Sequence, residues 1–184
     1  MIKLRHIFLA LLLVVVAITV AAPWTQWRTG RETLEPLNLT PGAPAVAQPE
    51  RIWIDTDASC GAKTRTDPDD CLAILWLVER GADVVGISTS FGNAPGEVVA
   101  DRTATLMVQM AIEGLPVPPV LLGHGAPVAP GAPEPPGITA LQAALEAGPM
   151  IVLALGPLTN VAAALEARPD LHRNVTRIVA VMGH

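Results

Sequence analysis

The sequence contains no tyrosine, and only 3% of its 184 residues are aromatic. It has no cluster of aromatic and basic side chains on which bases could stack, and its net charge of −5 gives no general attraction for a phosphate backbone. We therefore exclude nucleic acid as a partner. Because 51% of the residues are hydrophobic, the chain can still bury a sizeable core of Leu, Val, Ala and Ile, enough for one domain.

Histidine and cysteine are also scarce, with four and two copies respectively. They form no cluster with the spacing of a zinc site, which excludes zinc centres of the usual kind. His124 lies between two glycines in a loop, where a surface position is expected. The two cysteines, Cys60 and Cys71, could pair in an oxidising compartment, but their spacing alone leaves the paired and the free forms both open.

The N-terminal segment differs from the rest of the chain. Lys3 and Arg5 precede an uncharged apolar run that ends in small residues, as in a secretory signal peptide. The run is shorter than the roughly 20 residues of a spanning helix, which favours cleavage over permanent anchoring. We predict that residues 1–22 are a signal peptide or an N-terminal membrane anchor. The protein is then exported to the periplasm or the extracellular space, or attached to a membrane through residues 7–22.

The remainder divides into a Pro-rich linker, residues 23–50, and a domain, residues 51–184. Within the domain, apolar strand patterns alternate with helical patterns, which predicts an α/β fold. The fold class is a parallel, doubly wound (Rossmann-like) sheet flanked by helices. The expected strands are 52–56, 84–90, 117–122, 150–155 and 177–182, and the expected helices are 68–80, 96–113, 139–147 and 157–167.

Polar residues follow the strands of the predicted sheet. Asp55 and Asp57 end the first strand, Gly92 and Asn93 follow the second, and Thr159 and Asn160 follow the fourth. In open α/β sheets, ligands bind outside the carboxyl ends of the strands. The sequence therefore predicts that these polar groups converge on one crevice.

The stretch between Ile54 and Cys71 holds five aspartates. Asp67 can cap the helix that follows, and Asp69 and Asp70 suit the positive end of its dipole, without any function. That explanation does not cover Asp55 and Asp57, whose charges would repel those of the helix start. A divalent cation removes the repulsion, and calcium tolerates an irregular set of oxygen ligands.

These residues resemble a known family. The order and spacing of five motifs, from about Ile52 to Gly183, are similar to those of the inosine–uridine-preferring nucleoside hydrolases. Jointly the motifs are specific, although each alone is weak. They are Asp55-Thr56-Asp57, Asp69-Asp70, Gly92-Asn93, the run from Gly156 to Ala162, and Val181-Met182-Gly183.

The resemblance implies a calcium ion as cofactor. Asp57 matches the metal ligand that also takes a proton from the attacking water, which makes it the candidate catalytic residue. Asp70 matches the bidentate calcium ligand, and Thr159 matches the residue that lends its backbone carbonyl. The reaction implied is hydrolysis of the N-glycosidic bond of a ribonucleoside, through an oxocarbenium-like transition state, to ribose and free base.

The resemblance also implies a substrate-binding set. Asp69 and Asn93 match positions that hold the ribose hydroxyls, and Met182 matches one that packs near the sugar. Asp55 is expected behind them, orienting the loop or its neighbours. Members of the family form dimers or tetramers, so a homo-oligomer is a partner to expect beside the nucleoside.

Two features depart from the family pattern. The family loop reads D-x-D-P-G-x-D-D, whereas here residues 58–68 separate Asp57 from Asp69. The family also carries a further calcium-binding Asp, next to a His that assists the leaving base, beyond residue 184. We therefore interpret residues 51–184 as the N-terminal part of the family's domain, and we expect the isolated chain to be inactive.

Two other functions are compatible with parts of the sequence. The run Ile52-Trp53-Ile54-Asp55-Thr56-Asp57 resembles the nucleophile motif of haloacid dehalogenase-like phosphatases, in which the first Asp attacks phosphate. This alternative leaves the other motifs unexplained. The second alternative is an exported remnant that binds nucleosides or sugars without catalysis and without dependence on Asp57 or Asp70.

Overall fold

Strands and helices alternate along the chain as the apolar periodicity predicts. The computed structural model describes residues 50–63, 66–128 and 132–181. The predicted signal or anchor, residues 1–22, and nearly all of the predicted linker lie outside the described residues. No helix in the described ranges is both long enough and apolar enough to cross a membrane.

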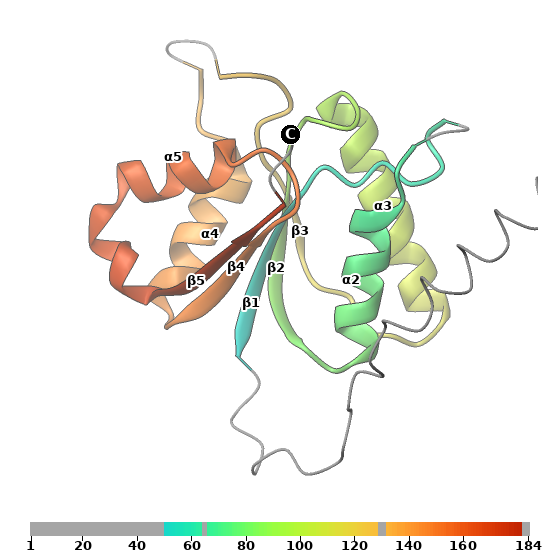
Figure 1. Ribbon diagram of the computed structural model, residues 1–184, viewed down its shortest axis with the longest axis horizontal. Coiled ribbons are helices and arrows are strands. Elements are labelled where there is room, and N and C mark those ends of the chain that lie inside the picture. Colours follow the sequence, from blue (N-terminus) through green and yellow to red (C-terminus); the bar gives the residue numbers. More distant parts are fainter. Residues whose placement is uncertain (1–49, 64–65, 129–131, 182–184) are drawn as a thin grey trace, which may run out of the picture. The chain divides into compact units, whose positions relative to one another are not determined.

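Within the described part of the domain there are five strands, four α-helices and one short 3₁₀ helix, arranged as Figure 1 shows. The strands are β1 Arg51–Thr56, β2 Asp83–Thr89, β3 Val120–Leu122, β4 Met150–Ala154 and β5 Val175–Ala180. The helices are α2 Asp69–Glu79, α3 Gly96–Ile112, α4 Pro136–Glu146, α5 Thr159–Ala167 and the 3₁₀ helix η1 Pro169–Asn174.

All the strands lie in one sheet of order β3-β2-β1-β4-β5, and every neighbouring pair is parallel. This is the doubly wound arrangement that the sequence predicts, so the expected fold class is confirmed. The chain builds outward from β1 through β2 to β3, then returns to the other side of β1 as β4 and β5. The strand order therefore reverses between β1 and β4.

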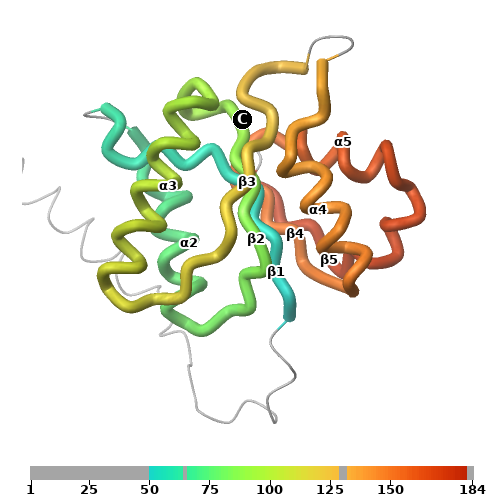
Figure 2. The backbone as a smooth tube through the Cα atoms, turned by 180° about the vertical axis from the view of Figure 1, so that it is seen from behind, coloured from blue at the N-terminus to red at the C-terminus, as the bar shows by residue number. Residues whose placement is uncertain are grey.

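Helices cover both faces of the sheet (Figures 1 and 2), with α2 and α3 on one face and α4 and α5 on the other. The central strand feeds both cores, because adjacent residues of a strand point to opposite faces. Trp53 packs with the residues of α4, β4 and α5, and Ile54 packs with those of α2, β2 and α3. Both side chains are fully or almost fully buried.

Prolines move two element boundaries away from the predicted positions. Helix α4 begins at Pro136, after Pro135, so Thr139 lies inside the helix instead of capping it. Proline suits the first helical position, where its missing N–H is not needed. The third strand begins only at Val120, because Pro118 and Pro119 have no N–H to donate to the neighbouring strand.

Candidate active site

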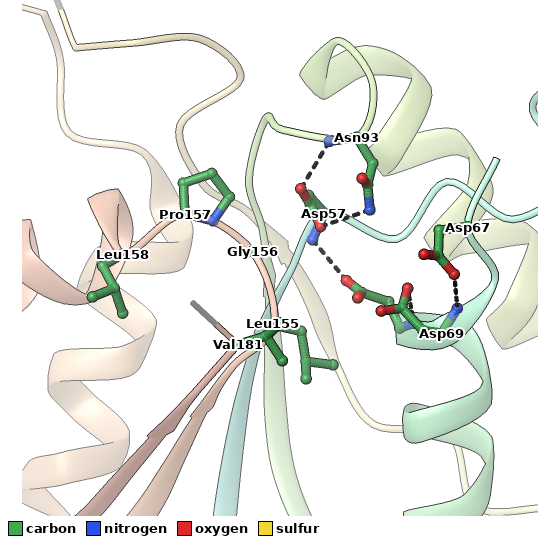
Figure 3. Close-up of a pocket in the computed structure, with 10 residues that line it drawn as sticks. Asp57, Asp67, Asp69, Asn93, Leu155, Gly156, Pro157, Leu158 and Val181 are labelled. Atoms are coloured by element: carbon green, nitrogen blue, oxygen red, sulfur yellow. Dashed lines mark hydrogen bonds between the residues drawn. The ribbon is translucent and has the colours of Figure 1, made fainter. Parts of the chain in front are cut away.

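A cavity of about 440 Å³ opens at the carboxyl ends of β1 and β4, where the strand order reverses. In doubly wound sheets this reversal is the usual place for a ligand. Its walls come from the segments after β1, β2 and β4, the start of α2, and the end of β5 (Figure 3). The lining residues are Asp57, Asp67, Asp69, Asp70, Asn93, Leu155, Gly156, Pro157, Leu158 and Val181.

Asp57 lies at the centre of this site, directly after β1, and is only 6% exposed. Its Oδ2 accepts a hydrogen bond from the backbone N–H of Asn93 at 2.8 Å, and its Oδ1 accepts one from the Asn93 side chain at 3.2 Å (Figure 3). The Gly92-Asn93 turn after β2 thus fixes the orientation of the Asp57 carboxylate.

Asp70 reaches the same place from the first turn of α2 and is 3% exposed. Its Oδ2 accepts hydrogen bonds from the Thr56 hydroxyl and, at 3.1 Å, from the backbone N–H of Asp57. Both of these hydrogen bonds end on Oδ2, and neither involves Oδ1. Burial, together with the neighbouring charges of Asp57 and Asp69, raises the pKa of Asp70 to about 7, although the Thr56 bond opposes the rise.

Asp55 lies behind the cavity and does not line it. It is fully buried, and its Oδ1 accepts hydrogen bonds from the Ser88 hydroxyl and, at 2.8 Å, from the side-chain amide of Asn160. Its Oδ2 has no partner among the described residues. Burial raises the pKa of Asp55 to about 6, against the effect of both hydrogen bonds. This position fits the expected orienting role.

Asn160 connects three segments of the site from one buried position. Besides Asp55, its side-chain amide donates to the Thr89 carbonyl at 3.0 Å, and its oxygen accepts from the His124 backbone N–H at 2.8 Å. The ends of β1 and β2 and the loop after β3 are therefore held by the first turn of α5. Sequence reasoning placed Asn160 at the crevice but gave it no role.

Two glycines are required because the backbone passes very close to Asp57. A Cβ on Gly92, whose φ is +154°, would lie 1.8 Å from Asp57 Oδ2. A Cβ on Gly156 would lie 2.6 Å from the Ser90 hydroxyl and 3.0 Å from the Asp57 nitrogen. The 1.8 and 2.6 Å distances are shorter than atoms without a bond can approach, so the glycines of the Gly-Asn and Gly-Pro motifs let the turns close around this carboxylate.

The other predicted site residues have different positions. Asp69 and Asn93 are both exposed, and both line the cavity. Thr159 begins α5 and is not among the lining residues, whereas Leu155, at the end of β4, is. Met182 lies outside the described residues.

Three further expectations concern the loop between β1 and α2 and the loop after β3. Asp67 is exposed, and Pro68, not Asp67, occupies the N-cap position of α2. Asp67 still accepts a hydrogen bond from the Asp69 N–H at 3.3 Å. His124 is 8% exposed, so the expected surface position is wrong: the hydrogen bond to Asn160 draws the loop inward. Cys60 and Cys71 form a disulfide.

The site's chemistry fits a hard divalent cation. Four of the ten lining residues are aspartates, and none of the ten is Lys or Arg. Asp57 and Asp70 are both buried and both line the cavity, and their carboxylates supply the anionic oxygens that calcium prefers. Within the described residues, no three His, Cys, Asp or Glu side chains are grouped closely enough to hold a metal alone. Carbonyls, waters or further residues would complete the six to eight ligands.

The raised pKa values predict how the stability of the metal-free protein depends on pH. Protonation of Asp55 and Asp70 is favoured by folding, because their folded-state pKa values, about 6 and about 7, exceed the ordinary 3.8. The contribution is therefore complete below pH 4 and is lost as pH rises through 6 to 7. We expect the free energy of unfolding in calcium-free buffer to fall by on the order of 5 kcal/mol between pH 4 and pH 7.

Urea titrations at pH 4, 5.5 and 7 would measure this dependence. Asp70→Asn, which cannot ionise, should flatten the upper part of the curve, and added calcium at pH 7 should restore stability to the unsubstituted chain only. A free energy of unfolding that stays level or increases between pH 4 and 7 would contradict the assignment.

The position of Asp55 argues against the phosphatase alternative. A nucleophilic aspartate must contact the substrate, whereas Asp55 is fully buried beneath the cavity and bonded to Ser88 and Asn160. The residue that faces the cavity is Asp57, together with groups that the phosphatase motif does not include.

Solved structures with the same fold are nucleoside hydrolases. A plant nucleoside hydrolase matches with a TM-score of 0.58 and 24% identity, over 74% of this chain and 48% of its own. A purine-preferring ribonucleoside hydrolase from Gardnerella vaginalis matches with a TM-score of 0.56 and 20% identity, over 73% of this chain and 49% of its own. At these identities the matches establish the fold.

The sequence comparisons establish the family. The probable uridine nucleosidase 2 of Arabidopsis thaliana is 31% identical over 76% of this chain and 49% of its own length. The protein of the same name from Oryza sativa subsp. japonica is 32% identical over 73% and 45%. The chain spans about half the length of these curated relatives. Residues 52–184 match the family described as inosine-uridine preferring nucleoside hydrolase, and the chain therefore belongs to this family.

Proposed function

We propose that the protein hydrolyses the N-glycosidic bond of ribonucleosides and releases ribose and the free base. The observation that carries the proposal is the meeting of the Asp57 and Asp70 carboxylates with Asn93 in one cavity at the reversal of the strand order. Membership of the family supports the reaction. The names of the two plant relatives support uridine as the first substrate to test.

Asp57 and Asp70 would hold a calcium ion between the end of β1 and the start of α2. For the backbone carbonyl that the resemblance assigns to Thr159, the cavity lining favours Leu155, four residues earlier. Calcium, when bound, supplies positive charge that neutralises the acidic groups and makes a nearby water more acidic.

Asp57 is the proposed general base. Its carboxylate is buried, is held by two hydrogen bonds from Asn93, and faces the cavity. It would accept the proton of the attacking water as the bond to the anomeric carbon forms. Because Asn93 fixes both of its oxygens, the carboxylate loses little freedom on reaching the transition state.

Asp69 and Asn93, which both line the cavity, would bind the ribose hydroxyls, with Met182 near the sugar. Binding energy from these groups holds the ring near its reactive shape. The positive charge that develops on the ring in the oxocarbenium-like transition state would be stabilised by the surrounding carboxylates.

We also propose where the protein is located and how it assembles. Disulfides persist in oxidising compartments, so the Cys60–Cys71 bond supports export, or anchoring through residues 1–22. A homo-oligomer is proposed on the family resemblance.

Ribose release from uridine and inosine would test the function. We expect no release above background by the 184-residue chain alone, because the leaving-group His and the further calcium-binding Asp of the family lie beyond residue 184. The same chain extended by the second half of the Arabidopsis relative should release ribose, and chelation of calcium should stop it.

The matched control is the extended protein with Asp57→Asn. Ribose release that survives both this substitution and chelation would contradict the proposal. Hydrolysis of an aryl phosphate in place of a nucleoside would support the phosphatase instead. Turnover by the 184-residue chain alone would refute its expected inactivity.

A further inference from the structure

The disulfide joins the two short segments that carry the candidate calcium ligands. Cys60 lies three residues after Asp57, and Cys71 directly follows Asp70. The bond connects them with a Cα–Cα distance of 6.4 Å, and Cys71 is 7% exposed. The covalent link thus spans the same gap, from the end of β1 to the start of α2, as the two carboxylates.

Few other contacts hold this gap closed. The Thr56 hydroxyl donates to Asp70 and accepts from the Ala58 N–H at 3.1 Å, and the Asp57 N–H donates to Asp70 at 3.1 Å. Both bonds to Asp70 end on one oxygen, Oδ2. Opposing them is the charge repulsion between the Asp57 and Asp70 carboxylates, because both residues line the cavity and none of its ten described lining residues is Lys or Arg.

The loop between the ligands adds a second difficulty. Residues 58–68 separate Asp57 from Asp69, where the family pattern has three residues. The described hydrogen bonds of its tip run within the loop, from the Ala62 N–H to the Ser59 carbonyl and from the Thr66 N–H to the Lys63 carbonyl. A longer loop samples more arrangements of its ends, and a cross-link near those ends removes most of them.

We propose that Cys60 and Cys71 are positioning residues for calcium: their disulfide holds the start of α2 against the end of β1, so that Asp57 and Asp70 are already together when the ion arrives. The inference rests on the proposed calcium site. It assigns to the disulfide the task that the short Pro-Gly turn performs in the family pattern, namely fixing the distance between the two ligand segments.

Calcium titration by calorimetry on the full 184-residue chain would test this. Three forms are compared: the oxidised chain, the double variant Cys60→Ser/Cys71→Ser, and the chain reduced with dithiothreitol. The reductant supplies the two electrons and two protons that convert the disulfide into two thiols, and closes to its own cyclic disulfide. We expect the calcium Kd to rise roughly 10- to 100-fold in the two forms that lack the disulfide, which is the size of effect expected when a cross-link closing a loop of this length is removed.

Two controls separate positioning from general stabilisation. Leu141→Ala, in the core on the opposite face of the sheet, should lower Tm without changing the calcium Kd. A rescue variant replaces residues 58–68, including Cys60, by Pro-Gly-Ala and carries Cys71→Ala. It should bind calcium within about threefold of the oxidised chain, since the short turn substitutes for the cross-link.

Each outcome has one meaning. Equal calcium affinity in the oxidised, reduced and double-variant forms would overturn the positioning role and leave the proposed function standing. The positioning role would also be overturned if Leu141→Ala, at the same loss of Tm, weakened calcium binding as much as loss of the disulfide does. It would equally be overturned if the variant with the short Pro-Gly-Ala turn failed to recover calcium affinity. If neither the oxidised chain nor its form extended by the second half of the Arabidopsis relative binds calcium, the proposed calcium site fails, and the positioning role fails with it.

Discussion

Asp57→Asn should weaken calcium binding by at least about 100-fold and, in a catalytically complete protein, lower turnover by at least about 1,000-fold. The substitution removes one of the two proposed buried anionic ligands and the proposed acceptor of the water's proton. It also turns an acceptor into a donor opposite the N–H groups of Asn93, which hold the carboxylate at 2.8 and 3.2 Å. Calorimetric calcium titration and ribose release would measure the two effects.

Asp67→Asn is the matched control, because Asp67 lines the same cavity but is exposed and belongs to the loop. It should change calcium affinity by less than about threefold, as expected for an exposed charge. Asp70→Asn should resemble Asp57→Asn in binding. If Asp57→Asn bound calcium as tightly as the unsubstituted chain, Asp57 could not be a ligand.

Asn160→Leu should destabilise the fold by about 3–5 kcal/mol, the largest effect on stability that we expect of a single substitution at this site. The change keeps the side chain's size but deprives Asp55, the Thr89 carbonyl and the His124 N–H of a partner. All of these groups lie at buried residues, where water cannot replace the lost bond. The expected decrease in Tm is about 10 °C.

Gln142→Leu provides the comparison for this second prediction. Gln142 is half-buried on α4, and its side chain donates one hydrogen bond, to the Ala164 carbonyl at 3.2 Å. Its replacement should cost less than about 1.5 kcal/mol, the usual contribution of one such bond. Thermal denaturation of both variants would compare the two losses of stability. Similar Tm values would show that the Asn160 network contributes no more than an ordinary hydrogen bond.

The fold was predictable because the strands carry continuous apolar runs and the helices carry a 3.6-residue period. The predicted strand at 150–155 matches β4 to within one residue, and the predicted helix at 96–113 matches α3 equally well. Predictions shifted where proline controls the backbone, at Pro136 and Pro118-Pro119. The η1 turn, Pro169–Asn174, was not predicted, since six residues are too few to show a period.

The convergence of Asp57, Asp70 and Asn93 was also predictable, because residues that follow parallel strands gather at one edge of the sheet. In the structure, the Asp70 carboxylate accepts a hydrogen bond from the Asp57 backbone N–H, and the Asp57 carboxylate accepts two from Asn93. The disulfide and the burial of His124 were not predictable, because both depend on how loops fold back over the sheet. The missed signal was Asn160. Its side-chain amide can both donate and accept hydrogen bonds, and it lies close to the end of a buried strand.

The sequence could not show which residue would lend its backbone carbonyl to calcium, for which we propose Leu155 in place of Thr159. Every residue has a backbone carbonyl, so the residue type carries no signal, and both residues belong to the segment that joins β4 to the start of α5. Only the lining of the cavity separates the two positions.

A crystal structure of the chain grown with calcium tests the central idea most directly, namely that one ion holds Asp57 and Asp70 together. We expect anomalous density for a single calcium ion within about 2.3–2.6 Å of a carboxylate oxygen from each residue. Density at another place, or the two carboxylates turned apart with no ion between them, would contradict it.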